Sequence, residues 1–276
     1  MPGLDSACIF QPVSSNGWVE GSGWNREKKK VHCFVLLYLS TALPVVTLFN
    51  KIKNKFLIRF TLGKDPAKRI IAFWKKNGPD FRYFESAEDP RWIDIFWKEE
   101  SLFRRLFSRL DLTRTLEIAC GAGRHSWQVR GQTGELYLLD SSAGALELAR
   151  QKFAGTDHVH FIHHPSGNGL PDSITDNSFS SIFSYDAMVH FEKETVRSYL
   201  LASFRALRPG GLCLFHYSNY HANPAGPFSA NPGWRNYLTQ ELFTQYFTEA
   251  GFTLIETHLT DFSAPQSDAV SLLLKP

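Results

Sequence analysis

The stretch Arg114-Thr-Leu-Glu-Ile-Ala-Cys-Gly-Ala-Gly-Arg-His-Ser126 decides the fold. Its first six residues predict a short buried strand. Gly121 and Gly123 follow at once, and glycine allows the backbone to approach a ligand closely and to turn directly into a helix. We therefore expect a strand, a glycine turn and a helix that together face a ligand.

The two glycines alone do not identify that ligand. Gly121-x-Gly123-x-x-Ser126 is a degraded form of the motif that binds nicotinamide dinucleotides, so this cofactor stays open here. A second predicted strand, 136–140, ends at Asp140, which lies 17 residues after Gly123. A carboxylate at this place accepts hydrogen bonds from ribose hydroxyls. Because dehydrogenases share this feature, Asp140 indicates a nucleoside without choosing the cofactor.

The downstream sequence continues the alternation of strands and helices. Residues 176–186 predict a fourth strand, residues 192–207 an amphipathic helix, and Arg208-Pro-Gly-Gly211 a turn into a strand over 212–216. A helix over 239–251 ends at a glycine, and strands follow over 252–259 and 269–274.

Four segments together carry a resemblance: E-I-A-C-G-A-G-R-H, L-L-D-S-S, D-N-S-F and L-R-P-G-G-L. Their order and spacing resemble the motif series of class I S-adenosylmethionine-dependent methyltransferases, especially the small-molecule group, over about 113–276. The resemblance implies an α/β fold with a doubly wound, mostly parallel seven-stranded sheet, its last strand antiparallel. The residues before the resemblance add a helical N-terminal lead-in. The resemblance also implies S-adenosylmethionine as the cofactor and O- or N-methylation of a small-molecule or sugar-like acceptor.

The same resemblance implies a set of cofactor contacts at the ends of the predicted strands. The residues expected around the methionine are Glu117, Ala119, Gly121 and Gly123. Asp140 and Ser141 are expected at the ribose, and Asn168 and Gly169 at the adenine. Ser184 and Tyr185 are expected to form the floor of the site. Arg124 either pairs with the cofactor's carboxylate or is a solvated charge at a helix end. The family often has glycine where Ala119 stands, so a methyl group is added at a tight turn.

Two histidines are candidate catalytic bases. His190 follows the fourth strand and His216 ends the fifth, and ligands bind at these ends of parallel strands. Positioning supplies much of the rate of methyl transfer from a sulfonium, and a hydroxyl acceptor also benefits from a base. The alternative for each is a structural histidine. The Asn/Pro/Gly-rich loop 218–237 predicts acceptor contacts from Asn219, Trp234 and Arg235, with a plain surface loop as the alternative.

Several classes of site and partner are disfavoured. His158, His160, His163 and His164 lack an acidic or cysteine ligand at fixed spacing, so we expect no metal. No N/D-P-P-Y/F sequence follows the fourth strand, which disfavours amino-methylation of adenine or glutamine. Four scattered cysteines without a CxxC pair indicate reduced thiols and a cytoplasmic protein.

Charge is spread unevenly along the 276 residues. Residues 1–60 carry a net charge of +5 and the remainder −2. A nucleic-acid substrate needs a basic footprint, so we expect no nucleic-acid partner for the catalytic region.

The sequence divides into four parts. We expect a disordered N-terminus over 1–30, a hydrophobic segment over 31–60, a helical lead-in or lid over 61–112 and the methyltransferase domain over 113–276. The run 31–49 holds no charged residue and is flanked by lysines, so a membrane anchor and a buried or interfacial helix both stay open. Asp65-Pro66 and Asp89-Pro90 each predict a helix start in the lead-in.

Two functional alternatives complete the analysis. One is a non-catalytic S-adenosylmethionine-binding subunit, tethered to a membrane, that works through a partner. The other is an aminopropyl transferase, which is disfavoured because the fourth strand offers only Asp186 to a polyamine.

Overall fold

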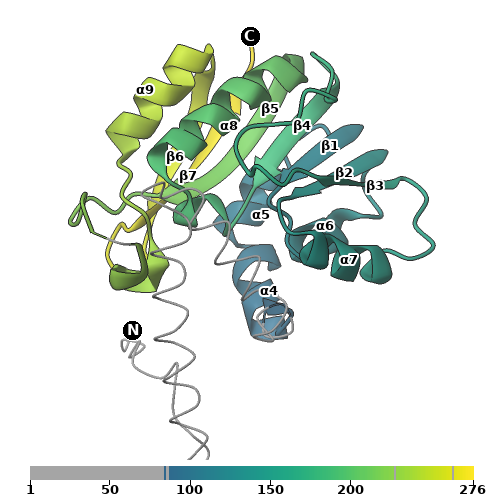
Figure 1. The fold of residues 1–276 in the computed structure, drawn as a ribbon, viewed down its shortest axis with the longest axis horizontal. Helices are drawn as coiled ribbons and strands as arrows, with labels where there is room; N and C mark the ends of the chain where they lie inside the picture. Colours follow the sequence, from purple (N-terminus) through teal and green to yellow (C-terminus); the bar gives the residue numbers. More distant parts are fainter. Residues whose placement is uncertain (1–83, 85–86, 227, 263) are drawn as a thin grey trace, which may run out of the picture. The chain divides into compact units, whose positions relative to one another are not determined.

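The computed structural model describes Phe84 and residues 87–226, 228–262 and 264–276 (Figure 1). Every described residue belongs to one compact unit, Lys64–Pro276. The predictions for 1–30, for 31–60 and for the helix start at Asp65 lie outside the described residues. No helix within the described part of the chain is long and apolar enough to cross a membrane.

Seven strands within the described residues form one sheet in the order β3-β2-β1-β4-β5-β7-β6 (Figure 1). Their bounds are β1 Arg114–Ile118, β2 Glu135–Asp140, β3 Val159–His163, β4 Phe179–Ser184, β5 Leu207–Ser218, β6 Thr253–Thr260 and β7 Asp268–Leu274. The first five strands run parallel, and β7 runs antiparallel to both β5 and β6. The predicted doubly wound sheet with an antiparallel last strand is confirmed.

Helices cover both faces of the sheet. Figure 1 shows α8 (Lys193–Ala206) and α9 (Gln240–Ala250) together, away from α6 (Arg124–Val129) and α7 (Ala143–Lys152). Neighbouring strand residues point to opposite faces. Thus Ile182 joins the core under α8 and α9, whereas Phe183 joins the core of the opposite face. Helices on both faces explain why every residue of β4 is buried.

The predicted helix starts and stops are present at α9. The Thr239 hydroxyl accepts a hydrogen bond of 3.2 Å from the Leu242 N–H, which caps the first turn. Gly251 ends the helix with φ 101°, a left-handed conformation that favours glycine.

Within residues 89–112, a described part of the lead-in, there are two helices. The apolar residues after Pro90 recur at mostly three- and four-residue spacing, which predicts one continuous helical face. α4 (Pro90–Trp97) begins at Asp89 as expected, but it ends at Lys98, and α5 (Leu102–Phe107) begins at a new cap, Ser101. The Ser101 hydroxyl donates to the Phe96 carbonyl and accepts from the Arg104 N–H, so one side chain serves both helix ends. α5 buries its apolar side against the sheet.

Candidate functional site

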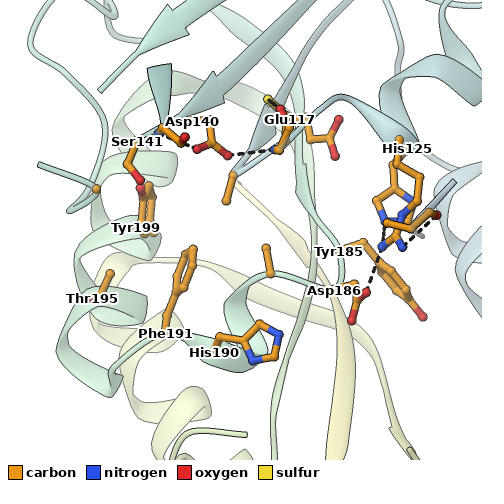
Figure 2. A pocket seen from close by; sticks show the side chains of 18 of the residues that line it. Glu117, His125, Asp140, Ser141, Tyr185, Asp186, His190, Phe191, Thr195 and Tyr199 are labelled. Atoms are coloured by element: carbon orange, nitrogen blue, oxygen red, sulfur yellow. Dashed lines mark hydrogen bonds and ion pairs between the residues drawn. The ribbon is translucent and has the colours of Figure 1, made fainter. Parts of the chain in front are cut away.

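A pocket opens at the carboxyl ends of β1, β2 and β4 (Figure 2). Its empty space, including the open mouth, is about 1080 Å³. Eight predicted site residues line it: Glu117, Ala119, Gly121, Arg124, Asp140, Ser141, Tyr185 and His190. Figure 2 shows Asp140 and Glu117 on one side and Phe191 and His190 across the empty space.

The turn after β1 is held in left-handed backbone. Ala119, Gly121 and Gly123 have φ values of 56°, 56° and 78°. A Cβ atom at Gly123 would lie 2.7 Å from the Phe153 ring, so the second glycine is required by space as well as by conformation. Ala119 adopts the same backbone region with a methyl group, which is unfavourable for an L-residue.

Asp140 ties this turn to the end of β2. Its Oδ2 accepts from the Gly121 N–H at 2.8 Å, and its Oδ1 accepts from the Ser142 N–H at 2.7 Å. Burial raises the pKa of Asp140, while these backbone N–H groups favour its charged form. Each carboxylate oxygen keeps a further lone-pair direction for a ligand hydroxyl.

Glu117 lies in β1 directly beneath the turn and is 1% exposed. Its Oε2 accepts from the Ser126 backbone N–H at 3.1 Å and also from the Ser126 hydroxyl. Burial raises the pKa of this carboxyl to about 7, although both Ser126 bonds oppose the rise. Glu117 therefore changes charge near neutral pH.

Arg124, at the start of α6, is paired inside the site. Its guanidinium lies 2.9 Å from the Asp186 carboxylate, and the two side chains are 13% and 16% exposed. It also lies over the Phe96 ring, 5.1 Å from its centre. The alternative of a solvated helix-end charge is wrong, and a contact to the cofactor's carboxylate stays a prediction.

His190 lies in a 3-10 helix, Met188–His190, that follows β4. Its Nδ1 is 2.6 Å from the Trp234 carbonyl oxygen. Since a carbonyl only accepts, Nδ1 carries the proton and Nε2 is the basic nitrogen of the neutral ring. Burial lowers the pKa of His190, which keeps the ring neutral at neutral pH.

The other candidate base, His216, does not line the pocket. It is 4% exposed and bonds to the Asp186 N–H and to the Asp268 carboxylate. Ser184 is also enclosed, with its hydroxyl donating to the Ile118 carbonyl at 2.9 Å. Both side chains therefore make hydrogen bonds inside the protein and do not line the pocket.

The residues predicted to contact adenine, Asn168 and Gly169, do not line the pocket, but their neighbour Gly167 does. Asn168 is exposed, and Gly169 packs near Ser198. Gly123 lies behind the turn, against Phe153. The role of Asn168 stays a prediction.

The three predicted acceptor contacts in the loop 218–237 lie outside the pocket lining. Asn219 bonds to the Gln266 carbonyl, and Trp234 is 41% exposed, with its ring edge-on to Phe228. Arg235 is 1% exposed and pairs with Asp268 at 2.6 Å. The prediction that Arg235 contacts the acceptor is wrong, because its guanidinium is enclosed.

Other lining residues went unassigned from the sequence. They come from the lead-in, the glycine turn, the starts of α6, α7 and α8, the loop after β3 and the segment after β4. These residues are Phe84, Ala87, Cys120, His125, Ser142, Gly167, Asp186, Ala187, Phe191, Glu192, Thr195 and Tyr199. Thr195 and Tyr199 stand four residues apart on α8, and helix periodicity from the end of β4 would have found them. Phe84 and Ala87 place part of the predicted lid at the pocket.

The histidines around β3 are engaged separately. His160 pairs with Glu135, and His158 lies 2.8 Å from the Arg130 carbonyl oxygen. Within the part of the chain that the structure describes, no three His, Cys, Asp or Glu side chains are grouped to hold a metal ion.

Comparison with known proteins matches the central part of this region. Residues 115–211 match the family profile described as a methyltransferase domain. Demethylmenaquinone methyltransferase of Staphylococcus aureus strain JH9 is 31% identical over 108 residues, which are 36% of this chain and 41% of the relative. The chain thus spans about two fifths of the length of the curated relatives it matches.

Solved structures share the fold. A methyltransferase chain from a complex with the Haloferax volcanii Trm112 methyltransferase activator superposes with a TM-score of 0.54 at 17% identity, over 75% of this chain and 97% of that one. An S-adenosylmethionine-dependent methyltransferase from Methanosarcina mazei gives 0.51 at 14% identity, over 63% and 98%. Geranyl diphosphate methyltransferase, solved with GPP and sinefungin, gives 0.51 at 13% identity, over 63% and 76%.

Proposed function

The chain carries a class I S-adenosylmethionine-dependent methyltransferase domain, and on this basis we propose that it transfers a methyl group to a hydroxyl or amine of a small-molecule acceptor. One observation carries the proposal. The pocket has two chemically different sides, with the glycine turn, Glu117 and Asp140 facing Asp186 and His190. The first side suits a nucleoside with an amino-acid tail, and the second suits a polar acceptor group.

The residues of the first side fit the cofactor. Asp140 has lone-pair directions for two ribose hydroxyls, and Glu117 offers a carboxylate to an ammonium group. Gly121 keeps its turn open at the wall, because it lacks a Cβ. Tyr199 supplies apolar ring surface for a base. We infer that these residues hold S-adenosylmethionine.

The residues of the second side are arranged to receive an acceptor. When bound, S-adenosylmethionine supplies a methyl group on a positively charged sulfur, which is already activated for displacement. His190 then takes the proton of an acceptor hydroxyl on Nε2, while its Nδ1–H stays bonded to the Trp234 carbonyl. Asp186, held by Arg124, accepts a hydrogen bond from a donor on the acceptor. Tyr185 and Phe191 exclude water around the reacting atoms.

The acceptor class follows from the chain's own pocket. The relative that shares 31% identity acts, by its name, on demethylmenaquinone. In this chain the acceptor side combines the Asp186–Arg124 pair and a neutral His190 with aromatic walls, which favours a small, mostly apolar acceptor with one or two polar groups. A polyanionic acceptor is disfavoured, because Arg124 is already neutralised by Asp186.

A labelled-cofactor screen tests the proposal. Full-length protein is incubated with methyl-labelled S-adenosylmethionine and a metabolite extract, and low-mass products are identified by mass spectrometry. We expect a labelled small molecule that is absent with Asp140→Ala. Label in nucleic acid or protein instead would refute the small-molecule acceptor. Binding of S-adenosylhomocysteine without any labelled product would favour the non-catalytic subunit.

A further inference from the structure

The buried ion pair Arg235–Asp268 lies behind Asp186 and His190, the two residues proposed to contact the acceptor. We propose that Arg235 and Asp268 are positioning residues, which fix Asp186 through His216 and fix His190 through the segment 234–236. The inference rests on the proposed acceptor roles of Asp186 and His190. Its test uses neither acceptor nor turnover.

The ion pair is enclosed and has two contact points. Arg235 Nε lies 2.7 Å from Asp268 Oδ1, and its Nη2 lies 2.6 Å from Oδ2. Both side chains are 1% exposed. Replacing a buried ion pair by apolar residues of similar volume is often neutral for stability, so the contacts of this pair are better read as fixing geometry. It joins the long loop after β5 to the first residue of β7.

The first branch runs from Asp268 to Asp186. The Asp186 backbone N–H donates to His216 Nδ1 at 3.1 Å, so this nitrogen carries no proton. The proton is therefore on Nε2, which donates to Asp268 Oδ2 at 2.9 Å. A ring that accepts on Nδ1 and donates from Nε2 is a neutral imidazole.

The target of this branch has an unfavourable backbone. Asp186 has φ 55°, a left-handed conformation that surrounding contacts must hold in place. The Tyr185 ring stacks on the His216 ring with centres 4.4 Å apart, which fixes the imidazole plane. His216 thus holds the Asp186 turn, and this turn directs the carboxylate to Arg124 in the pocket wall.

The second branch runs from Arg235 to its two neighbours in sequence. The Trp234 carbonyl accepts from His190 Nδ1, and the Asn236 N–H donates to the Val189 carbonyl at 2.9 Å. The Asn236 side-chain amide also donates to the His190 carbonyl. The segment 234–236 therefore binds the His190 ring and backbone, and Arg235 anchors its middle.

The protonated ring nitrogens of the wild-type chain give the first test. In the full-length chain with ¹⁵N-labelled histidine, two-bond ¹H–¹⁵N spectra show which nitrogen of each ring carries the proton. His216→Gln and His190→Gln assign the two signals among the ten histidines. We expect a neutral Nε2–H form for His216 and a neutral Nδ1–H form for His190. A cationic ring, or the opposite form of either, overturns the proposal.

Variants then separate the two branches. Arg235→Lys keeps the charge beside Asp268 but loses the two-point contact. We therefore expect the ring-nitrogen signals of His190 to shift and to report a mixture of the Nδ1–H and Nε2–H forms. We expect S-adenosylhomocysteine affinity to change by less than about twofold, since the cofactor side is untouched. His216→Gln should leave the His190 signal in place. The matched control is Arg205→Lys, opposite exposed Asp176, which should move neither signal.

Each contrary result is decisive. An unchanged His190 signal in Arg235→Lys overturns the second branch, and so does a His190 shift in His216→Gln that equals the Arg235→Lys shift. If Arg235→Lys does not fold, the proposal is decided by which ring nitrogen carries the proton in His216 and in His190 of the wild-type chain. A chain that shows no methyl transfer still gives these readings, so failure of the proposed function is seen separately.

Discussion

Asp140 Oδ2 accepts a hydrogen bond of 2.8 Å from the backbone N–H of Gly121, which joins the end of β2 to the turn after β1. This bond orients the carboxylate at the pocket before any ligand arrives. The same carboxylate therefore holds the turn and lines the part of the pocket proposed for the nucleoside. A change at Asp140 is therefore expected to affect both the fold and the affinity for the cofactor.

Asp140→Ala is predicted to weaken S-adenosylhomocysteine binding by about 1.5–3 kcal/mol, the scale of lost hydrogen bonds to a charged group. Isothermal titration calorimetry of the full-length chain measures this change. Asp176→Ala, an exposed aspartate away from the pocket, is the matched control and should bind as wild type. Unchanged affinity of the Asp140 variant would show that the ribose is held elsewhere.

Gly123→Ala is predicted to lower the free energy of unfolding by more than about 2 kcal/mol, from the left-handed backbone and from overpacking together. The new Cβ would lie 2.7 Å from the Phe153 ring and 3.1 Å from Leu138. Chemical denaturation measures the loss. Gly131→Ala is the control, because its Cβ would meet nothing within 4 Å. Equal stability of the two variants would contradict the geometry of the turn.

The sequence predicted the fold because the deciding signals are local. β1 and β2 lie within one residue of their predicted bounds, as does α9 with its Thr239 cap and Gly251 stop. The lead-in differs because apolar spacing continues across Lys98–Ser101, while the Ser101 side chain ends one helix and begins the next. Periodicity alone does not reveal such a break.

The site was predictable only as far as its motifs are continuous. Glu117, Gly121 and Asp140 come from short segments with known spacing, and all three line the pocket. Arg235 and His216 find their common partner, Asp268, 33 and 52 residues further along the chain. No local pattern marks such a pairing, so the sequence predicts an acceptor contact where the structure has a buried arginine.

Ala119→Gly is predicted to raise the free energy of unfolding by about 0.5–1 kcal/mol. The left-handed backbone costs an L-residue about 1–2 kcal/mol, and the greater freedom of glycine in the unfolded chain offsets part of the gain. Thermal and chemical unfolding measure the change. Ala143→Gly at the start of α7 is the comparison, and it should destabilise, because helical backbone favours alanine. A less stable Ala119→Gly chain would show that the methyl group packs usefully.

Glu117 predicts a pH dependence of both stability and binding. Its pKa is about 7 in the folded chain against an ordinary 4.5, so folding favours the protonated carboxyl. Its contribution to stability is therefore full below about pH 4.5, falls as the pH rises, and levels off above about pH 7. An ammonium ligand favours the carboxylate, so S-adenosylhomocysteine should bind about tenfold tighter at pH 8 than at pH 6.

Calorimetry at several pH values tests this dependence on Glu117. Glu117→Gln should bind more weakly and lose most of the change between pH 6 and pH 8. A wild-type affinity that is flat over this range would mean that Glu117 does not meet a charged group of the ligand. A slope that survives in Glu117→Gln would assign the titration to another residue.

His190→Gln is predicted to lower methyl transfer to a hydroxyl acceptor by about 10²–10⁴-fold, the usual contribution of a positioned base. S-adenosylhomocysteine affinity should stay near that of wild type, since His190 lies across the pocket from Asp140 (Figure 2). Burial lowers the pKa of His190. At saturating S-adenosylmethionine, which removes the effect of Glu117 on cofactor binding, the wild-type rate should hold to a lower pH than an ordinary histidine allows and then fall as the ring is protonated. That fall should vanish in His190→Gln. His160→Gln, which replaces a histidine paired with Glu135 outside the pocket lining, is the control and should keep both rate and pH profile. A His190→Gln enzyme with an unchanged rate and the same acid limb would assign the proton transfer to another group, or to none.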